Sequence, residues 1–99
     1  MIDLGLISGF EWDEGNSRMN EKHGVSTAEA EQVFFNTPLF FFEDVLHSPD
    51  EPRIHILGKT DDERTLHITV AMRQSNALIR VISARPMNRN EKVIYEQGN

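Results

Sequence analysis

The strongest constraint on the fold is a strand-like alternation in residues 64–74, RTLHITVAMRQ. Apolar and polar side chains follow each other with a period of two, so in an extended strand the two sets point to opposite sides. The apolar set is Leu66, Ile68, Val70 and Met72, and the polar set is Thr65, His67, Thr69 and Arg73. A strand with one apolar and one polar side is typical of an antiparallel sheet with one buried face and one face in water.

Neighbouring segments extend this sheet. Residues 39–45 (LFFFEDV) and 53–59 (RIHILGK) have the composition of strands, and a loop with two prolines, 47–52, separates them. A tight connection at residues 75–76 then leads into a last predicted strand, 77–84 (ALIRVISA). The sequence pattern therefore predicts about four antiparallel strands joined by turns.

Helices are expected on both sides of these strands in the chain. Residues 12–22 have the pattern of a short helix. Ser26 and Glu29 have the spacing of a capping box, and the apolar stripe that follows them predicts a second helix that faces the core. Asn88 and Glu91 repeat that spacing before the last predicted helix. We expect one α+β domain over the whole chain, with N-terminal helices, an antiparallel sheet of about four strands covered on one face, and a C-terminal helix.

The charge of the chain is unevenly distributed. The formal net charge of −6 is unusual for a protein that binds nucleic acid. Residues 1–50 hold two cations and ten acidic residues, a net of −8, whereas residues 51–99 hold eight cations and six acidic residues, a net of +2. A basic surface is therefore expected on the C-terminal half. The acidic first half would either attract a basic partner or simply be a solvated surface.

Several classes of protein are excluded by composition. The chain has no cysteine, which excludes disulfides and thiolate metal sites and fits a reducing cytoplasm. No apolar run is long enough to cross a bilayer, and the first residues lack the basic flank of a signal peptide, so we expect a cytoplasmic protein without membrane contact. The four histidines, at 23, 47, 55 and 67, have no close ligand spacing, and we predict neither a metal nor another cofactor. His55 and His67 are nevertheless able to meet across adjacent strands.

The remaining chemistry is that of arginine. Arg80 and Arg85 flank Ser83, and Arg64 opens the longest predicted strand. A guanidinium group stays protonated and binds phosphate oxygens through two parallel hydrogen bonds, which favours binding and cleavage of a phosphodiester. RNA cleavage needs no metal, because the 2′-hydroxyl attacks the neighbouring phosphorus once a base takes its proton and an acid protonates the leaving oxygen.

Lys22 and His23 lie at a corner, where Gly24 ends the first predicted helix before the next one begins. With an ordinary pKa of about 6.5, the imidazole of His23 suits proton transfer at neutral pH, and Lys22 would neutralise developing charge. The alternative is structural, because cations are favoured at the C-terminus of a helix. The arginines of the last strand also have a structural alternative, as ion-pair partners of Glu91 or Glu96.

The ordered motifs of residues 10–96 resemble those of BrnT-type toxins. That pattern begins with Trp-Asp, an asparagine and Lys-His-Gly-Val, present here as Trp12, Asp13, Asn20, Lys22, His23, Gly24 and Val25. It continues with Glu-x-Arg, a glycine and Arg-x-Leu, present as Glu51, Arg53, Gly58, Arg64 and Leu66. It ends with Arg-x-Ile-Ser-x-Arg, a glutamate and a tyrosine, present as Arg80, Ile82, Ser83, Arg85, Glu91 and Tyr95.

The resemblance implies a small bacterial ribonuclease toxin with a RelE-like fold. Its activity would be metal-independent cleavage of RNA, with ribosome-associated mRNA as one candidate substrate, which inhibits translation and growth. A BrnA-type antitoxin would neutralise it, and DNA contact would be only indirect, through that antitoxin. The implied catalytic residues are Lys22, His23, Glu51, Arg64 and Arg85, with Glu51 competing with His23 as the base. The implied substrate-binding residues are Arg53, Arg80 and Ser83.

Two other interpretations stay open. In the first, the chain is a catalytically inactive toxin-like module that acts only as the partner of a DNA-binding antitoxin in a repressor. In the second, it is a metal-dependent nuclease that uses His55 and His67, although no third ligand is evident in the sequence.

Overall fold

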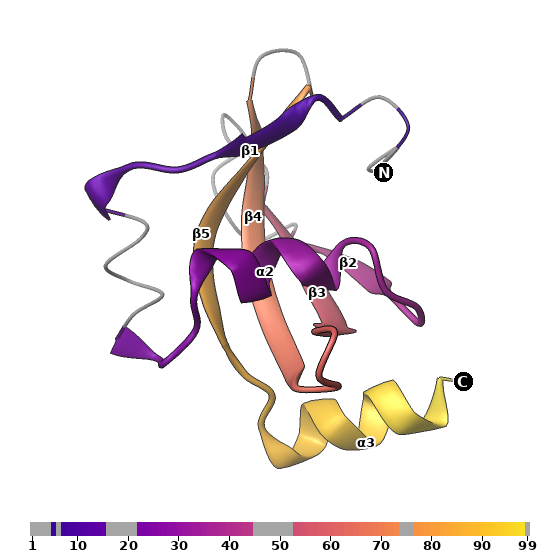
Figure 1. The fold of residues 1–99 in the computed structure, drawn as a ribbon. Coiled ribbons are helices and arrows are strands. Elements are labelled where there is room, and N and C mark those ends of the chain that lie inside the picture. Colours follow the sequence, from indigo (N-terminus) through magenta and orange to yellow (C-terminus); the bar gives the residue numbers. More distant parts are fainter. Residues whose placement is uncertain (1–4, 6, 16–21, 45–52, 74–76, 99) are drawn as a thin grey trace.

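A computed structural model describes residues 5, 7–15, 22–44, 53–73 and 77–98. One five-stranded sheet has the order β1-β5-β4-β3-β2 (Figure 1). Its strands are β1 (Gly9–Glu11), β2 (Phe40–Asp44), β3 (Arg53–Lys59), β4 (Thr65–Arg73) and β5 (Leu78–Pro86). The helices are α2 (Thr27–Val33) and α3 (Arg89–Gln97).

The four predicted antiparallel strands are confirmed, since β2 to β5 pair antiparallel in chain order. The predictions for the N-terminal region were partly wrong, because the short strand β1 precedes the helices and pairs parallel to β5, which makes the sheet mixed. A three-residue strand is too short to show a period of two, and its stability comes from the strand beside it and from Phe10, whose ring packs 5.2 Å from that of Phe34. Of the helix predicted over 12–22, residues 16–21 lie outside the described residues, as do the loop 47–52 and the connection 75–76.

Both predicted capping boxes are present. Ser26 Oγ accepts from the backbone N–H of Glu29 at 3.1 Å, and the Glu29 carboxylate accepts from the Ser26 backbone N–H at 3.1 Å. Asn88 and Glu91 make the same reciprocal pair at 2.8 and 2.9 Å. Each box satisfies backbone donors that a helix N-terminus leaves free, so both helices begin where the sequence predicts.

Helix α2 covers the apolar face of the sheet (Figure 1). Its buried residues Ala30 and Val33 pack onto strand residues that lose all or nearly all of their exposed surface, namely Ile56, Leu66, Ile68, Val70, Ile79 and Val81. This burial is the main source of stability for a domain of this size. The contact is close at Gly58, where an added Cβ would lie 2.5 Å from Val33 Cγ1.

Helix α3 packs at one end of the opposite face, so the prediction of a single covered face was incomplete. Tyr95 forms a second buried cluster with Leu57, Met87 and the partly buried Phe40. Its hydroxyl donates to the Pro38 carbonyl at 2.7 Å, which ties the helix to the segment before β2. Over the rest of this sheet face, neither α2 nor α3 packs against the strands through these two clusters.

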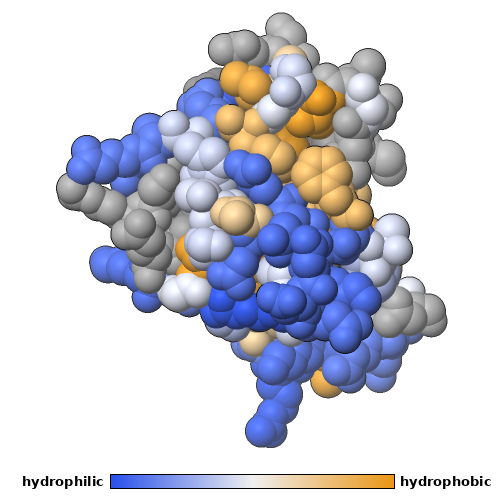
Figure 2. All heavy atoms as spheres, viewed as in Figure 1, coloured by the Kyte–Doolittle hydropathy of each residue, from blue (hydrophilic) through white to orange (hydrophobic). Residues whose placement is uncertain are grey.

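The view onto α2 shows an uneven surface. Apolar side chains gather over β1 and the adjoining end of the sheet, while hydrophilic side chains cover α2 and α3 (Figure 2). Phe35, just after α2, is 78% exposed. Among the nearby phenylalanines, Phe34 is buried, whereas Phe42 is exposed like Phe35. Within the described residues, no helix has both the length and the apolar character to cross a membrane.

Candidate functional site

Cross-strand register gathers polar side chains on the sheet face opposite α2. His55 pairs with Thr69 and Thr69 with Ser83, while His67 pairs with Arg85 on the next strand. Arg53 and Arg80 both pair with Ala71, one from each side. Directly opposed residues share a face of a sheet. We call this set the polar face: Arg53, His55, His67, Thr69, Arg80, Ser83 and Arg85.

A β-bulge in β5 brings Arg80 onto the polar face. Thr69 pairs with Ser83, but the next residue, Val70, pairs with Val81, so Ile82 is an extra residue in β5. An extra residue reverses the alternation of side chains beyond it. Without this bulge, Arg80 would lie on the opposite side from Ser83 and Arg85, because their residue numbers differ by odd steps.

The two histidines of the polar face stack. Their ring centroids are 5.1 Å apart and the planes make an angle of 26°. His55 is fixed at both ring nitrogens, with Nε2 2.9 Å from Asp44 Oδ2 and Nδ1 3.0 Å from Thr69 Oγ1. The expectation that His55 and His67 meet across adjacent strands is confirmed.

His67 differs from His55 in the hydrogen bonding of its ring nitrogens. Its Nδ1 is buried without a hydrogen-bond partner, and its Nε2 lies 3.9 Å from Glu91 Oε2, beyond hydrogen-bond distance. Burial lowers the pKa of His67 below its ordinary value, the positive charge of Arg85 and the electrostatic interaction with His55 lower it further, and the carboxylate of Glu91 opposes them. At neutral pH the ring is therefore neutral.

The lowered pKa of His67 predicts a loss of stability in mild acid. The unfolded chain binds a proton at this residue near pH 6.5, whereas the folded protein resists it. The stabilising contribution is therefore complete above about pH 6.5 and is lost as the pH falls through the folded pKa. Urea unfolding should show that the free energy of unfolding falls as the pH is lowered from about 7.5 to about 5.5. The change in this free energy per pH unit should be smaller in His67→Gln. Equal slopes in the two proteins would contradict the assignment.

Carboxylates accompany the arginines of the polar face. Arg85 binds Glu91 through two hydrogen bonds of 2.8 and 2.9 Å, which confirms one of its predicted structural alternatives. Arg80 binds Glu11 at 3.1 Å and Asp13 at 2.8 Å, rather than either glutamate of the last helix. These hydrogen bonds raise the pKa of both guanidinium groups. A phosphate that enters this face has to compete with carboxylates already in place.

A second group of predicted residues lies at the corner before α2. Lys22 and His23 are exposed, and Gly24 has the left-handed backbone angle φ of +71° that a helix end favours. Arg64 donates to the Gly24 carbonyl at 2.7 Å and to both carboxylate oxygens of Glu29. The predicted site residues thus form two groups, the corner group of Lys22, His23 and Arg64 and the group on the polar face. Glu51 lies outside the described residues.

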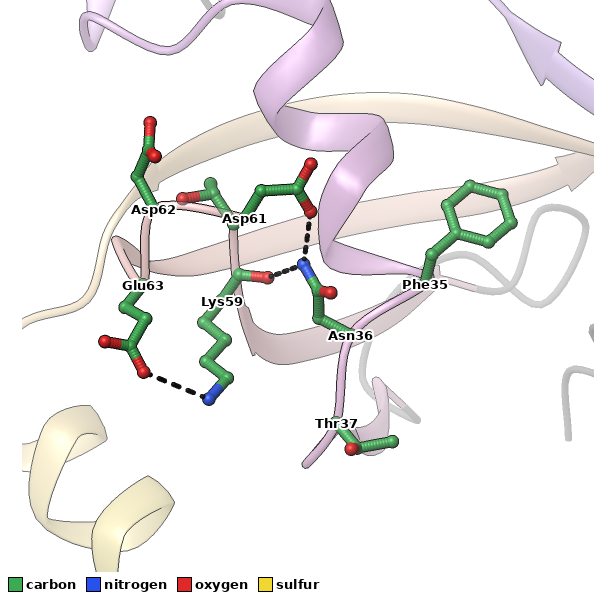
Figure 3. A pocket seen from close by; sticks show the side chains of 8 residues that line it. Phe35, Asn36, Thr37, Lys59, Asp61, Asp62 and Glu63 are labelled. Atoms are coloured by element: carbon green, nitrogen blue, oxygen red, sulfur yellow. Dashed lines mark hydrogen bonds and ion pairs between the residues drawn. The ribbon is translucent and has the colours of Figure 1, made fainter.

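An open cavity of about 520 Å³ lies near the end of α2. Its lining includes Asp61, Asp62 and Glu63 on one side and the ring of Phe35 on the other (Figure 3). Lys59 pairs with Glu63 there, at 3.5 Å. Three neighbouring carboxylates repel phosphate, so this cavity does not suit an RNA backbone.

Metal ligands do not gather in the described part of the chain, where no three histidine, cysteine or acidic side chains are close enough to hold an ion. His55 and Asp44 are in contact, but they bond to each other, and the second ring nitrogen of His55 contacts Thr69. The side chains that come nearest to forming a metal site are therefore already bonded to protein groups.

Comparison with known families shows to which family the chain belongs. A family model described as the ribonuclease toxin BrnT of a type II toxin–antitoxin system matches residues 12–91. The chain belongs to the BrnT family. No curated protein sequence matches the chain. The matched range contains both groups of predicted residues, the corner group and the polar face.

Sequence reasoning left His55, His67 and Thr69 out of the BrnT site residues. Their signal was the period of two, which placed His67 and Thr69 on one side of their strand and His55 on the polar side of the next. What the pattern lacked was the pairing register, which brings Thr69 to His55 and Arg85 to His67. Register depends on contacts between strands that are far apart in the chain.

Proposed function

We propose that this BrnT-family protein is a metal-independent endoribonuclease that inhibits translation and growth, and that a BrnA-type antitoxin neutralises it. Membership of a family of ribonuclease toxins supports the class of activity. The proposal includes a RelE-like fold, a cytoplasmic site of action and contact with DNA only through the antitoxin. The order of elements, with a helix before the antiparallel strands and another after them, is compatible with that fold.

The observation that carries this proposal is the convergence of Arg53, Arg80, Ser83 and Arg85 on one sheet face. Guanidinium groups bind phosphate oxygens in pairs, and a hydroxyl donates one more hydrogen bond. In our proposal Arg80 and Arg85 exchange their carboxylate partners for the RNA backbone. Their fixed positive charge then stabilises the additional negative charge of the pentacovalent transition state.

The corner group has a second role in this proposal. Lys22 and His23 are exposed and lie beside Arg64 through its bond to Gly24. We assign Lys22 and Arg64 to contact with the RNA backbone and His23 to hydrogen bonding there. This contact lies on the α2 side of the sheet, because Arg64 bonds Glu29 of α2. Glu51 stays the proposed alternative to a histidine as the base that takes the proton of the 2′-hydroxyl.

Inducible expression of the lone chain in bacteria tests the function. We expect growth arrest and RNA fragments with cyclic phosphate at one new end and a 5′-hydroxyl at the other, because the 2′-oxygen is the attacking group. The purified protein should cleave RNA equally well in excess chelator, and co-expression of the cognate antitoxin should restore growth. Cleavage that stops in chelator and returns with a divalent cation would instead establish the metal-dependent mechanism.

The inactive module is the second candidate. It is favoured by the carboxylates that occupy Arg80 and Arg85, since a surface neutralised in this way binds phosphate weakly. Harmless accumulation of the folded chain, together with no cleavage of RNA by the purified protein, would establish this candidate and reject the ribonuclease.

A further inference from the structure

We propose that His67 is the general base of RNA cleavage and that the chain of contacts from Asp44 through His55 to Thr69 positions its ring. This inference rests on the proposed ribonuclease function. It assigns proton transfer to an imidazole on the polar face, whereas the sequence pointed to His23 at the corner.

The first argument is the hydrogen bonding of the two stacked rings. Both nitrogens of His55 contact protein groups, Asp44 at 2.9 Å and Thr69 at 3.0 Å, so this ring is held in place. Neither nitrogen of His67 is within hydrogen-bond distance of a described group. A base must exchange a proton with the substrate, and His67 is the imidazole of the pair that is free to do so.

The second argument is the position of an anion beside His67. The Glu91 carboxylate bonds Arg85, with Oε2 2.9 Å from Nη2, and the same Oε2 lies 3.9 Å from His67 Nε2. An anionic oxygen therefore already sits between the guanidinium and the imidazole. A phosphate that replaces the carboxylate at Arg85 would lie next to Nε2, and its neighbouring 2′-hydroxyl comes within reach of the ring.

The third argument is the protonation state. The charged and titratable groups that face His67 are Arg85 from β5, Glu91 from α3 and His55 from β3. Burial, Arg85 and the neighbouring His55 ring lower the pKa of His67 more than Glu91 raises it, so the ring is neutral at pH 7 and able to accept a proton. Since Nδ1 is covered, Nε2 is the nitrogen that meets the substrate.

The proposed step is balanced. Nε2 takes the proton of the 2′-hydroxyl, and the 2′-oxygen forms a bond to phosphorus as the bond from phosphorus to the 5′-oxygen breaks. A water molecule or the imidazolium then protonates the leaving 5′-oxygen. The products are a 2′,3′-cyclic phosphate and a 5′-hydroxyl. His67 is neutral again once its proton has passed to the leaving oxygen directly, or to the hydroxide that remains where water was the proton donor.

The test is the pH dependence of RNA cleavage by the purified full chain. For the wild type, kcat/KM should fall in acid with an apparent pKa below the usual value of histidine, because protonation removes the base. His67→Gln should lower kcat by about 100-fold or more, the usual worth of a general base, and should abolish this acid limb. His55→Gln, which loses only positioning, should retain the limb with a shifted apparent pKa and a smaller loss of kcat.

Two further variants separate chemistry from folding. Lys92→Gln removes a charge from an exposed position on α3 and should behave as the wild type. In His67→Ala, added imidazole should restore part of the activity, which a purely structural role would not allow. Folded His67→Gln with the wild-type acid limb would overturn the inference, as would loss of that limb in His23→Gln alone. If the wild type cleaves no RNA, it is instead the proposed function that fails.

Discussion

Replacing Arg85 with alanine is expected to reduce RNA cleavage by about 100-fold or more and to relieve growth arrest, since loss of one oxyanion-stabilising donor has an effect of this size. Arg85 is the cross-strand partner of His67, and its two donors form a bidentate pair with the Glu91 carboxylate. That geometry is the one that phosphate oxygens need. Arg85→Lys retains the charge but loses the planar pair of donors, so its activity should lie between those of the wild type and the alanine variant.

Arg89→Ala is the matched control for this experiment. Arg89 is an exposed arginine in the first turn of α3, and its removal changes the net charge by the same amount. The control should cleave RNA at the wild-type rate. Loss of Arg85 also leaves Glu91 without its ion-pair partner, so thermal melting has to show that the alanine variant is folded. A folded Arg85→Ala protein with wild-type kcat/KM would contradict the phosphate-binding role.

Replacing Gly58 with alanine is expected to cost about 1–3 kcal/mol of stability, because the new methyl group has no room. It would lie 2.5 Å from Val33 Cγ1 and 2.9 Å from Leu39 Cδ1. Val33 is fully buried in the contact between α2 and the sheet, so it has no free direction in which to move. Each kcal/mol lowers Tm by roughly 4–8 °C in a domain of about this length, which thermal melting detects easily.

Gly9→Ala is the matched control, because the nearest atom to an added Cβ there is Leu78 Cδ2 at 3.9 Å, an ordinary contact. Its effect on stability should stay within about 0.5 kcal/mol. In the double variant of Gly58→Ala with Val33→Ala, the loss of stability should be smaller than the sum of the two single losses, since the added methyl group clashes with the valine side chain. Full stability of Gly58→Ala alone would show that the packing of α2 on β3 is looser than described.

Local patterns predicted the elements in the middle and at the end of the chain. The alternation of residues 64–74 anticipated β4, and RIHILGK coincides with β3. Both capping boxes formed at the predicted residues, because a cap depends on side chains only three positions apart. Such features are predictable since the interacting groups are close in the sequence.

The strand β1 and the composition of the candidate site were not predictable in this way. The parallel pairing of Gly9–Glu11 with β5 joins segments almost seventy residues apart, and no periodicity reveals it. The pairing of Glu91 with Arg85 was one of the predicted alternatives, but the approach of Glu91 to His67 requires α3 to pack against the sheet. These contacts are decided by how elements dock, which a single sequence does not specify locally.

The sequence by itself determined which residues form the antiparallel strands, where two helices begin, and that one side of β3 and β4 is polar. Those properties follow from the alternation of side chains along an extended chain and from short-range capping. The tertiary structure alone decided that Arg80 joins Ser83 and Arg85, because the bulge at Ile82 reverses the alternation of β5. Strand register and this one extra residue turned scattered arginines and histidines into a single surface.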